Sequence, residues 1–125
     1  MVRSLILIGV GSCIGGISRY LIQQFVQKHF PSSFPFGTLS VNIIGCFIIG
    51  LVYALSAKGN IISPDFRLFM ATGICGGFTT FSAFAYENVR LLQDGELFYM
   101  GIYILLSVVL GLASVYLGIL FIKLM

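Results

Sequence analysis

The residues best suited to chemistry form one compact run inside an uncharged stretch, Gly76-Gly77-Phe78-Thr79-Thr80-Phe81-Ser82. Glycine costs about 1 kcal/mol relative to alanine inside a helix, and β-branched threonine is restricted at χ1 there. The run therefore predicts a helix break. Inside a membrane, backbone groups freed by a break must be satisfied by protein, water or an ion, and broken helices place carbonyls around cations. Close helix packing is the alternative use of small residues.

Two further polar side chains stand in apolar surroundings. Asn42 offers two N–H donors and one carbonyl acceptor, which suits either an interhelical hydrogen bond or a donor facing a polar pathway. Arg19 marks a functional site, because arginine inside a membrane span is costly, unless its long side chain extends to the interface. Its charge would suit a vestibule that collects anions. Glu87 indicates interfacial polarity or a partner for a basic group.

Aromatic rings and hydroxyls recur near these positions. Phe81 and Phe84 flank the polar Ser82, and a phenylalanine ring edge carries the positive part of the quadrupole. An edge aimed at a pathway would favour an anion, whereas the ordinary role of phenylalanine in a span is packing. Tyr103 and Ser107 lie at i and i+4 on one helix face, which is compatible with either a polar track or close packing.

The composition excludes a soluble domain. Hydrophobic residues make up 58% of the 125 residues and charged residues only 9%, against roughly 25% charged in soluble chains. The seven Lys and Arg residues are scattered and form no basic stripe, so no nucleic-acid partner is expected. The chain is predicted to lie in a lipid bilayer as a multi-pass membrane protein.

The uncharged stretches predict four membrane helices in a single domain, residues 1–125. A spanning helix needs about 20 apolar residues, and the expected spans are 3–27, 37–57, 66–90 and 97–123. Both termini then share one side of the membrane. The connecting loops show only a slight Lys/Arg bias, which permits insertion in either direction.

The chain lacks the residues that several functional classes require. The chain has no Ser/His/Asp set, metal-ligand cluster or phosphate loop, so it is not predicted to be an enzyme. Its carboxylates stand at the edges of the predicted spans, which argues against a proton-coupled cation exporter. The chain has three cysteines, Cys13, Cys46 and Cys75, and no two of them form a C-x-x-C motif. This favours a role as small buried side chains over disulfides or metal ligands.

Three motifs occur together in this chain: Gly15-Gly16-x-x-Arg19-Tyr20, Gly37-Thr38-Leu39-x-Val41-Asn42-x-x-Gly45 and Gly76-Gly77-Phe78-Thr79-Thr80-Phe81-Ser82-x-Phe84. In combination they resemble the Fluc/CrcB family of fluoride channels, over all four predicted helices. The resemblance implies an all-α membrane protein with four transmembrane helices, a break in the third, and an antiparallel, dual-topology homodimer. It also implies passive export of fluoride across the bacterial inner membrane, which reduces fluoride toxicity.

The resemblance also assigns roles to individual residues. It implies that the backbone carbonyls of Gly76 and Thr79 bind a central structural Na⁺ that is not itself transported. The implied fluoride pathway consists of Asn42, Phe81, Phe84, Thr80, Ser82, Tyr103 and Ser107, with Arg19 at the vestibule. The chain departs from many relatives in carrying Ala83, Ala85 and Gly111 where they carry hydroxyls.

Two other classes remain as alternatives. A small multidrug-type cation exporter shares the size, the four spans and the dual orientation, but it requires an acidic residue in the first span. A non-transporting structural membrane subunit would leave the unusual third span without an explanation. Fluoride efflux from liposomes that contain only this protein separates all three.

Overall fold

The computed structural model describes residues 1–59 and 61–125, and in these residues the chain is helical without β-strands. The helices in chain order are α1 (Val2–His29), α2 (Phe36–Ala57), α3 (Pro64–Arg67), the π-helix η1 (Leu68–Cys75), α4 (Gly76–Phe78), α5 (Phe81–Gln93) and α6 (Leu97–Lys123).

Within the described residues, four helical segments are long and apolar enough to cross a membrane: Val2–His29, Phe36–Ala57, Pro64–Gln93 and Leu97–Lys123. This confirms the prediction of four hydrophobic helices. The third segment is a composite, because α3, η1, α4 and α5 follow one another within it.

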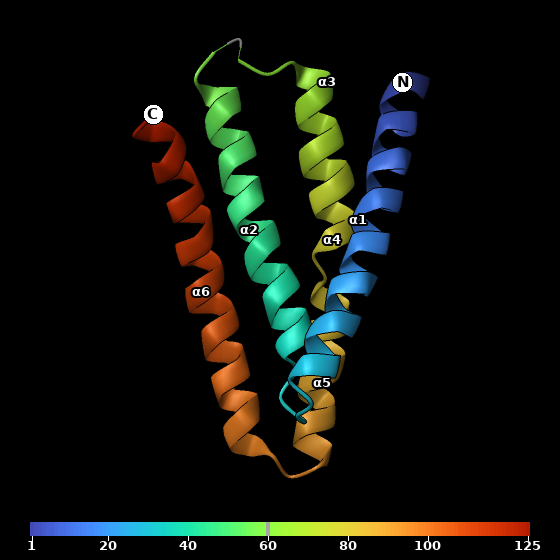
Figure 1. Ribbon diagram of the computed structural model, residues 1–125, viewed down its shortest axis with the longest axis vertical. Coiled ribbons are helices and arrows are strands. Elements are labelled where there is room, and N and C mark those ends of the chain that lie inside the picture. Colours follow the sequence, from blue (N-terminus) through green and yellow to red (C-terminus); the bar gives the residue numbers. More distant parts are fainter. Residues whose placement is uncertain (60) are drawn as a thin grey trace.

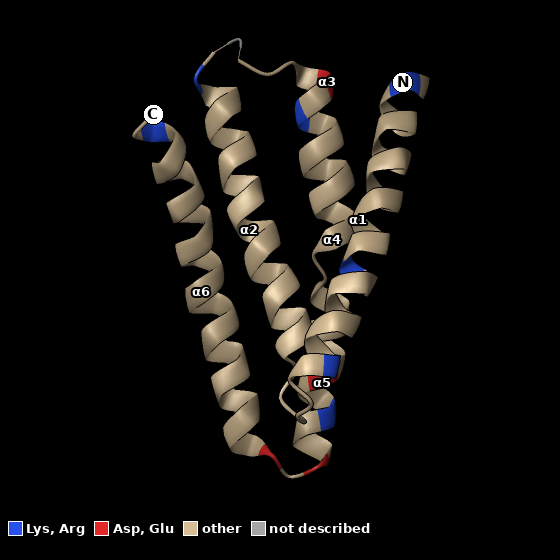
Figure 2. Ribbon diagram, in the orientation of Figure 1, with Lys and Arg blue, Asp and Glu red and all other residues tan. Residues whose placement is uncertain are grey.

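The helices form two packed pairs that diverge toward the end that carries both termini (Figure 1). In one pair α2 lies along α6, and in the other α1 lies along η1 and α4. The Lys, Arg, Asp and Glu residues gather mainly near the two ends of the helices (Figure 2). This is the distribution expected when the apolar middle of each helix lies in hydrocarbon.

Glycines let α1 approach the first half of the third segment at backbone distance. A methyl group added to Gly11 would lie 2.7 Å from the carbonyl oxygen of Phe69, and one added to Gly77 would lie 2.6 Å from that of Ser12. A methyl group on Gly15 would collide with the carbonyl of Ile74. Small residues at such contacts are how membrane helices pack closely.

The helical path of the third segment is interrupted after α4. Thr79 has φ −87° and ψ 156°, and Thr80 has φ −150° and ψ 121°, so both residues are extended. The Thr80 hydroxyl then accepts from the amide of Ala83 at 3.1 Å and caps the start of α5, a role for which threonine is well suited. Two extended residues thus separate α4 from α5.

A small buried cluster of Phe34, Leu39, Leu91 and Tyr103 joins the far ends of α2, α5 and α6. Tyr103 is completely buried, and Phe84 and Ile43 pack against the same cluster. This cluster holds α5 against α6 and thereby places the segment that follows Thr80 beside α2.

Candidate functional site

Asn42 of α2 clamps the extended segment through two hydrogen bonds to one residue. Its Nδ2 donates to the Thr80 carbonyl at 3.1 Å, and its Oδ1 accepts from the Thr80 amide at 2.8 Å. The side-chain amide thus pairs with the backbone of Thr80 much as a neighbouring strand would. Asn42 is half-buried, and one N–H of its amide nitrogen remains after this pairing.

The clamp and the helix cap divert two amides from their helical acceptors. The Thr80 amide would close a helical turn onto the Gly76 carbonyl, but it donates to Asn42. The Ala83 amide would close a helical turn onto the Thr79 carbonyl, but it donates to the Thr80 hydroxyl. The carbonyls of Gly76 and Thr79 therefore lose their helical donors.

Uncharged carbonyl oxygens are hard ligands of the kind that unwound membrane helices present to Na⁺. Gly76 and Thr79, which the family resemblance implies as sodium ligands, both offer an oxygen of this kind. Among the described residues, no group of three or more His, Cys, Asp or Glu side chains could bind a metal ion.

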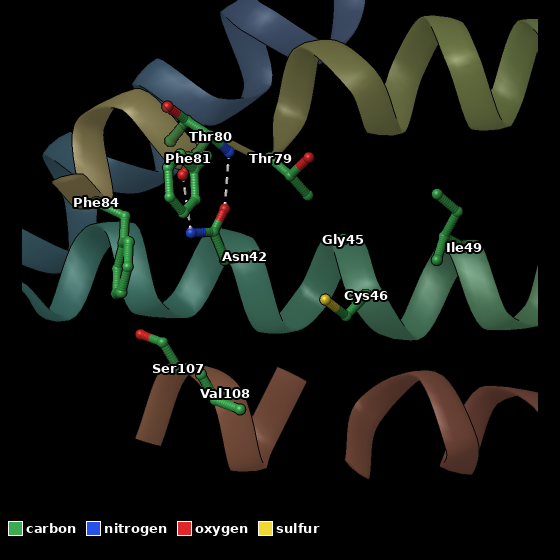
Figure 3. A pocket seen from close by; sticks show the side chains of 10 residues that line it. All are labelled: Asn42, Gly45, Cys46, Ile49, Thr79, Thr80, Phe81, Phe84, Ser107 and Val108. Carbon is green, nitrogen blue, oxygen red and sulfur yellow. Dashed lines mark hydrogen bonds between the residues drawn. The ribbon is translucent and has the colours of Figure 1, made fainter. Parts of the chain in front are cut away.

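A cavity of about 360 Å³ lies beside the extended segment, between α2, α5 and α6. Figure 3 shows the Asn42 amide facing Thr80 on one side and the Ser107 hydroxyl between α6 and α2 on the other. The cavity thereby brings together six predicted site residues: Asn42, Thr79, Thr80, Phe81, Phe84 and Ser107. Gly45, Cys46, Ile49 and Val108 complete its wall.

The cavity wall combines aromatic rings with a hydroxyl that is free to donate. Phe81 and Phe84 lie with ring centroids 5.7 Å apart, and Phe81 is 77% exposed. The Ser107 Oγ is buried and has no hydrogen-bond partner in the part of the chain that the structure describes. Thr80 Oγ1 and Ser82 Oγ lie 3.3 Å apart, which places the predicted Ser82 at the same interruption.

Tyr103 lies behind this cavity rather than in its wall. Its ring packs on Phe84 with a centroid distance of 5.0 Å, and its hydroxyl donates to Glu87 Oε1 at 2.8 Å. Glu87 Oε2 accepts from the Thr38 hydroxyl at 2.7 Å. The Tyr103 proton is therefore directed at a carboxylate and not at the cavity.

Arg19 contacts the other side of the interruption. Its Nε donates to the Gly77 carbonyl at 3.3 Å, and its Nη1 donates to Gln23 Oε1 at 3.2 Å. The guanidinium is half-buried and sits at the carbonyl end of α4, where a positive charge is favourable.

Sequence reasoning missed Gln23 and Thr38 as site residues. Gln23 Nε2 donates to Thr38 Oγ1 at 3.0 Å, and Thr38 is 2% exposed. The available signal was their polarity at the ends of two apolar stretches. Their partners lie on other helices, so spacing along one helix did not reveal the contacts.

Four membrane-length helices, an interrupted third segment and, beside that interruption, a largely apolar cavity with a few uncharged polar groups define a class. They are the features of multi-pass membrane channels and transporters, in which irregular backbone lines an internal cavity.

Comparison with known proteins identifies the family. Residues 6–119 match the family described as "CrcB-like protein, Camphor Resistance (CrcB)", and the chain belongs to this family. Relatives named "Fluoride-specific ion channel FluC" include one from Chlorobium phaeobacteroides (strain BS1), 47% identical over 115 residues, which are 92% of this chain and 89% of the relative. A second, from Flavobacterium psychrophilum, is 40% identical over 121 residues, or 97% and 98% of the two chains.

Proposed function

We propose that this chain forms a fluoride-selective channel that lets fluoride leave the cytoplasm passively across the inner membrane of a bacterial cell. The relatives named as fluoride-specific ion channels support the choice of ion. The observation that carries the proposal is the cavity beside Thr79 and Thr80, whose polar lining of Asn42, Thr80 and Ser107 consists of uncharged groups.

Neutral donors suit an ion that must be dehydrated and then released. A selective pore replaces the hydration shell of the ion while binding it weakly enough for it to move on. The remaining N–H of Asn42 and the unpartnered Ser107 hydroxyl supply donors without a fixed positive charge that would trap fluoride. The edges of Phe81 and Phe84 add weak positive potential.

The direct test is fluoride efflux from liposomes that contain only the purified protein. We expect rapid efflux of fluoride, slow efflux of chloride under the same gradient, and the leak rate in protein-free liposomes. Equal rates for the two anions would contradict selectivity, and fluoride efflux at the leak rate would contradict the proposal as a whole.

We further propose that two copies assemble as an antiparallel homodimer. The support is the exposed interruption within a membrane span, because Gly76, Ser82 and most of Phe81 are uncovered in the single chain. Polar backbone that faces hydrocarbon is costly, and a second copy would cover it. Tags on the termini should be accessible from both sides of the membrane in comparable amounts, and a single uniform orientation would contradict the proposal.

We also propose a structural Na⁺ bound by the carbonyls of Gly76 and Thr79, with equivalent carbonyls from the second copy. The loss of helical donors at both carbonyls supports it. A bound cation would satisfy these oxygens and supply positive potential near the anion path. Prolonged replacement of sodium by a large organic cation should lower both the melting temperature of the dimer and the fluoride efflux. Unchanged values after full exchange would contradict the site.

A further inference from the structure

A continuous row of side-chain hydrogen bonds joins the arginine of α1 to the carboxylate of α5. Arg19 donates to Gln23 at 3.2 Å, Gln23 donates to Thr38 at 3.0 Å, and Thr38 donates to Glu87 at 2.7 Å. Every donor in the row points from the cation toward the anion. The bonds in such a chain polarise one another, so the row couples the charges of Arg19 and Glu87 electrostatically.

Both charges at the ends of this row need compensation. Arg19 lies in the first membrane-length segment and Glu87 in the third, and both are half-buried. An isolated charge within a span is costly and normally pairs with another. Arg19 and Glu87 form no direct ion pair, because the one ion pair among the described residues joins Arg3 to Asp65. The two intervening side chains are therefore their connection.

The ends of the row contact the site itself. Arg19 Nε donates to the carbonyl of Gly77, directly before the extended segment, and Glu87 Oε1 accepts the hydroxyl of Tyr103, which packs on Phe84. The row thus passes from one side of the interruption to the aromatic wall of the cavity.

We propose that Arg19 and Glu87 act as one charge-compensated unit, coupled through Gln23 and Thr38, in which Arg19 is a positioning residue. The unit holds the Gly77 carbonyl at one end and fixes the Tyr103 hydroxyl away from the cavity at the other. It also prevents a lone carboxylate from repelling an anion near Phe84. The flux measurements below rest on the proposed fluoride function, whereas the melting measurements do not.

Arg90 is the competing partner for Glu87. It lies one turn further along α5 and lines, with Glu87, Gln27 and Asp94, a cavity of about 430 Å³. Arg90 is exposed and forms no ion pair with Glu87 in the described part of the chain. Exposed charges are screened by water and salt, so Arg90 provides a matched control cation.

The test is a pair of double-variant cycles, measured on fluoride efflux and on the melting of the detergent-solubilised protein. We expect Arg19→Gln and Glu87→Gln each to slow efflux by about tenfold or more. Fluoride efflux through the variant with both changes should fall much less than the product of the two single-variant losses predicts. Arg90→Gln combined with Glu87→Gln should give additive effects. Additive effects in the Arg19 cycle, or coupling of Glu87 to Arg90 instead, would overturn the proposal.

Two milder variants keep the test decisive if a charge deletion prevents folding. Gln23→Met cuts the row without removing a charge, and it should be harmful with both charges present but nearly neutral in the Arg19→Gln/Glu87→Gln background. Arg19→Lys retains the charge and should recover much of the efflux lost in Arg19→Gln. Equal harm from Gln23→Met in both backgrounds, or equal loss in the lysine and glutamine variants, would show a merely structural role.

Failure of this inference is distinguishable from failure of the fluoride function. If the wild-type protein conducts no fluoride, the function fails and the cycles are read on melting alone. If it conducts and the Arg19–Glu87 coupling is absent from both measurements, only the charge unit is overturned.

Discussion

The two halves of the third membrane segment are held in place by different forces. Before the interruption, η1 and α4 lie against α1 at backbone distance, through glycines such as Gly15 and Gly77 that leave no room for a side chain. After it, α5 is tied to its neighbours by the buried apolar cluster around Leu91 and by side-chain hydrogen bonds, those of Asn42 to Thr80 and of Thr38 and Tyr103 to Glu87.

This difference separates folding from conduction. Backbone packing through glycine tolerates no added atoms, so changes in the first half should act on stability. The hydrogen bonds of the second half leave carbonyls and hydroxyls beside a cavity, so changes there should act on ion flux. The comparison predicts that the two kinds of defect can be produced independently.

The largest expected effect comes from the adjacent glycines Gly15 and Gly16. A methyl group on Gly15 would collide with the Ile74 carbonyl, whereas one on Gly16 would meet no atom of the described residues within 4 Å. Overpacking against backbone costs about 1–3 kcal/mol or more, so Gly15→Ala should sharply lower the melting temperature and the yield of folded protein. Gly16→Ala is the control and should fold normally. Equal stability of the two variants would contradict the claim that glycine packing against α1 stabilises the first half of the segment.

A smaller effect, on flux rather than on folding, is expected from the phenylalanines. Phe81→Ile should leave the melting of the single subunit unchanged, because the ring is 77% exposed there. Phe84→Ile loses an aromatic contact with Tyr103 and should be slightly less stable. Loss of a ring edge should slow fluoride efflux by about five- to tenfold. Unchanged efflux in both variants would show that these rings pack in the protein but do not contribute to the fluoride pathway.

The smallest effect within one chain is expected at Gly76, although it begins α4 in the half that packs against α1. A methyl group there meets only the Ala71 carbonyl, at an ordinary 3.8 Å, among the described residues. Gly76→Ala should therefore leave folding of the single chain intact. If the proposed sodium and second copy approach Gly76, this variant should instead weaken the dimer and its response to sodium. A fully stable, sodium-responsive dimer would argue against that approach.

Sequence patterns predicted the membrane helices because charge and hydropathy are local properties. The second span was expected at 37–57 and the helix runs from Phe36 to Ala57. The unusual residues Gly76 to Ser82 drew attention to the third segment for the same reason, since propensity is read from neighbours along the chain.

The tertiary contacts of the site could not be predicted in this way. Thr38 and Glu87 are 49 residues apart, and Arg19 and the Gly77 carbonyl are 58 apart. Their contacts depend on how four helices cross, which no single-helix periodicity specifies. The same limit explains why the hydrogen bond from Arg19 to the Gly77 carbonyl was not predicted, whereas the vestibule role of Arg19 stays a prediction.

The decisive measurement compares fluoride efflux from liposomes that contain equal amounts of the wild-type protein or of Asn42→Asp. The aspartate keeps an acceptor for the Thr80 amide, but it has no N–H for the Thr80 carbonyl and places a negative charge in the cavity wall. We predict fluoride efflux at the protein-free leak rate from protein that still folds, with a melting temperature below that of the wild type because one hydrogen bond of the clamp is lost. Wild-type efflux from folded Asn42→Asp would contradict the claim that fluoride passes beside the interruption of the third segment.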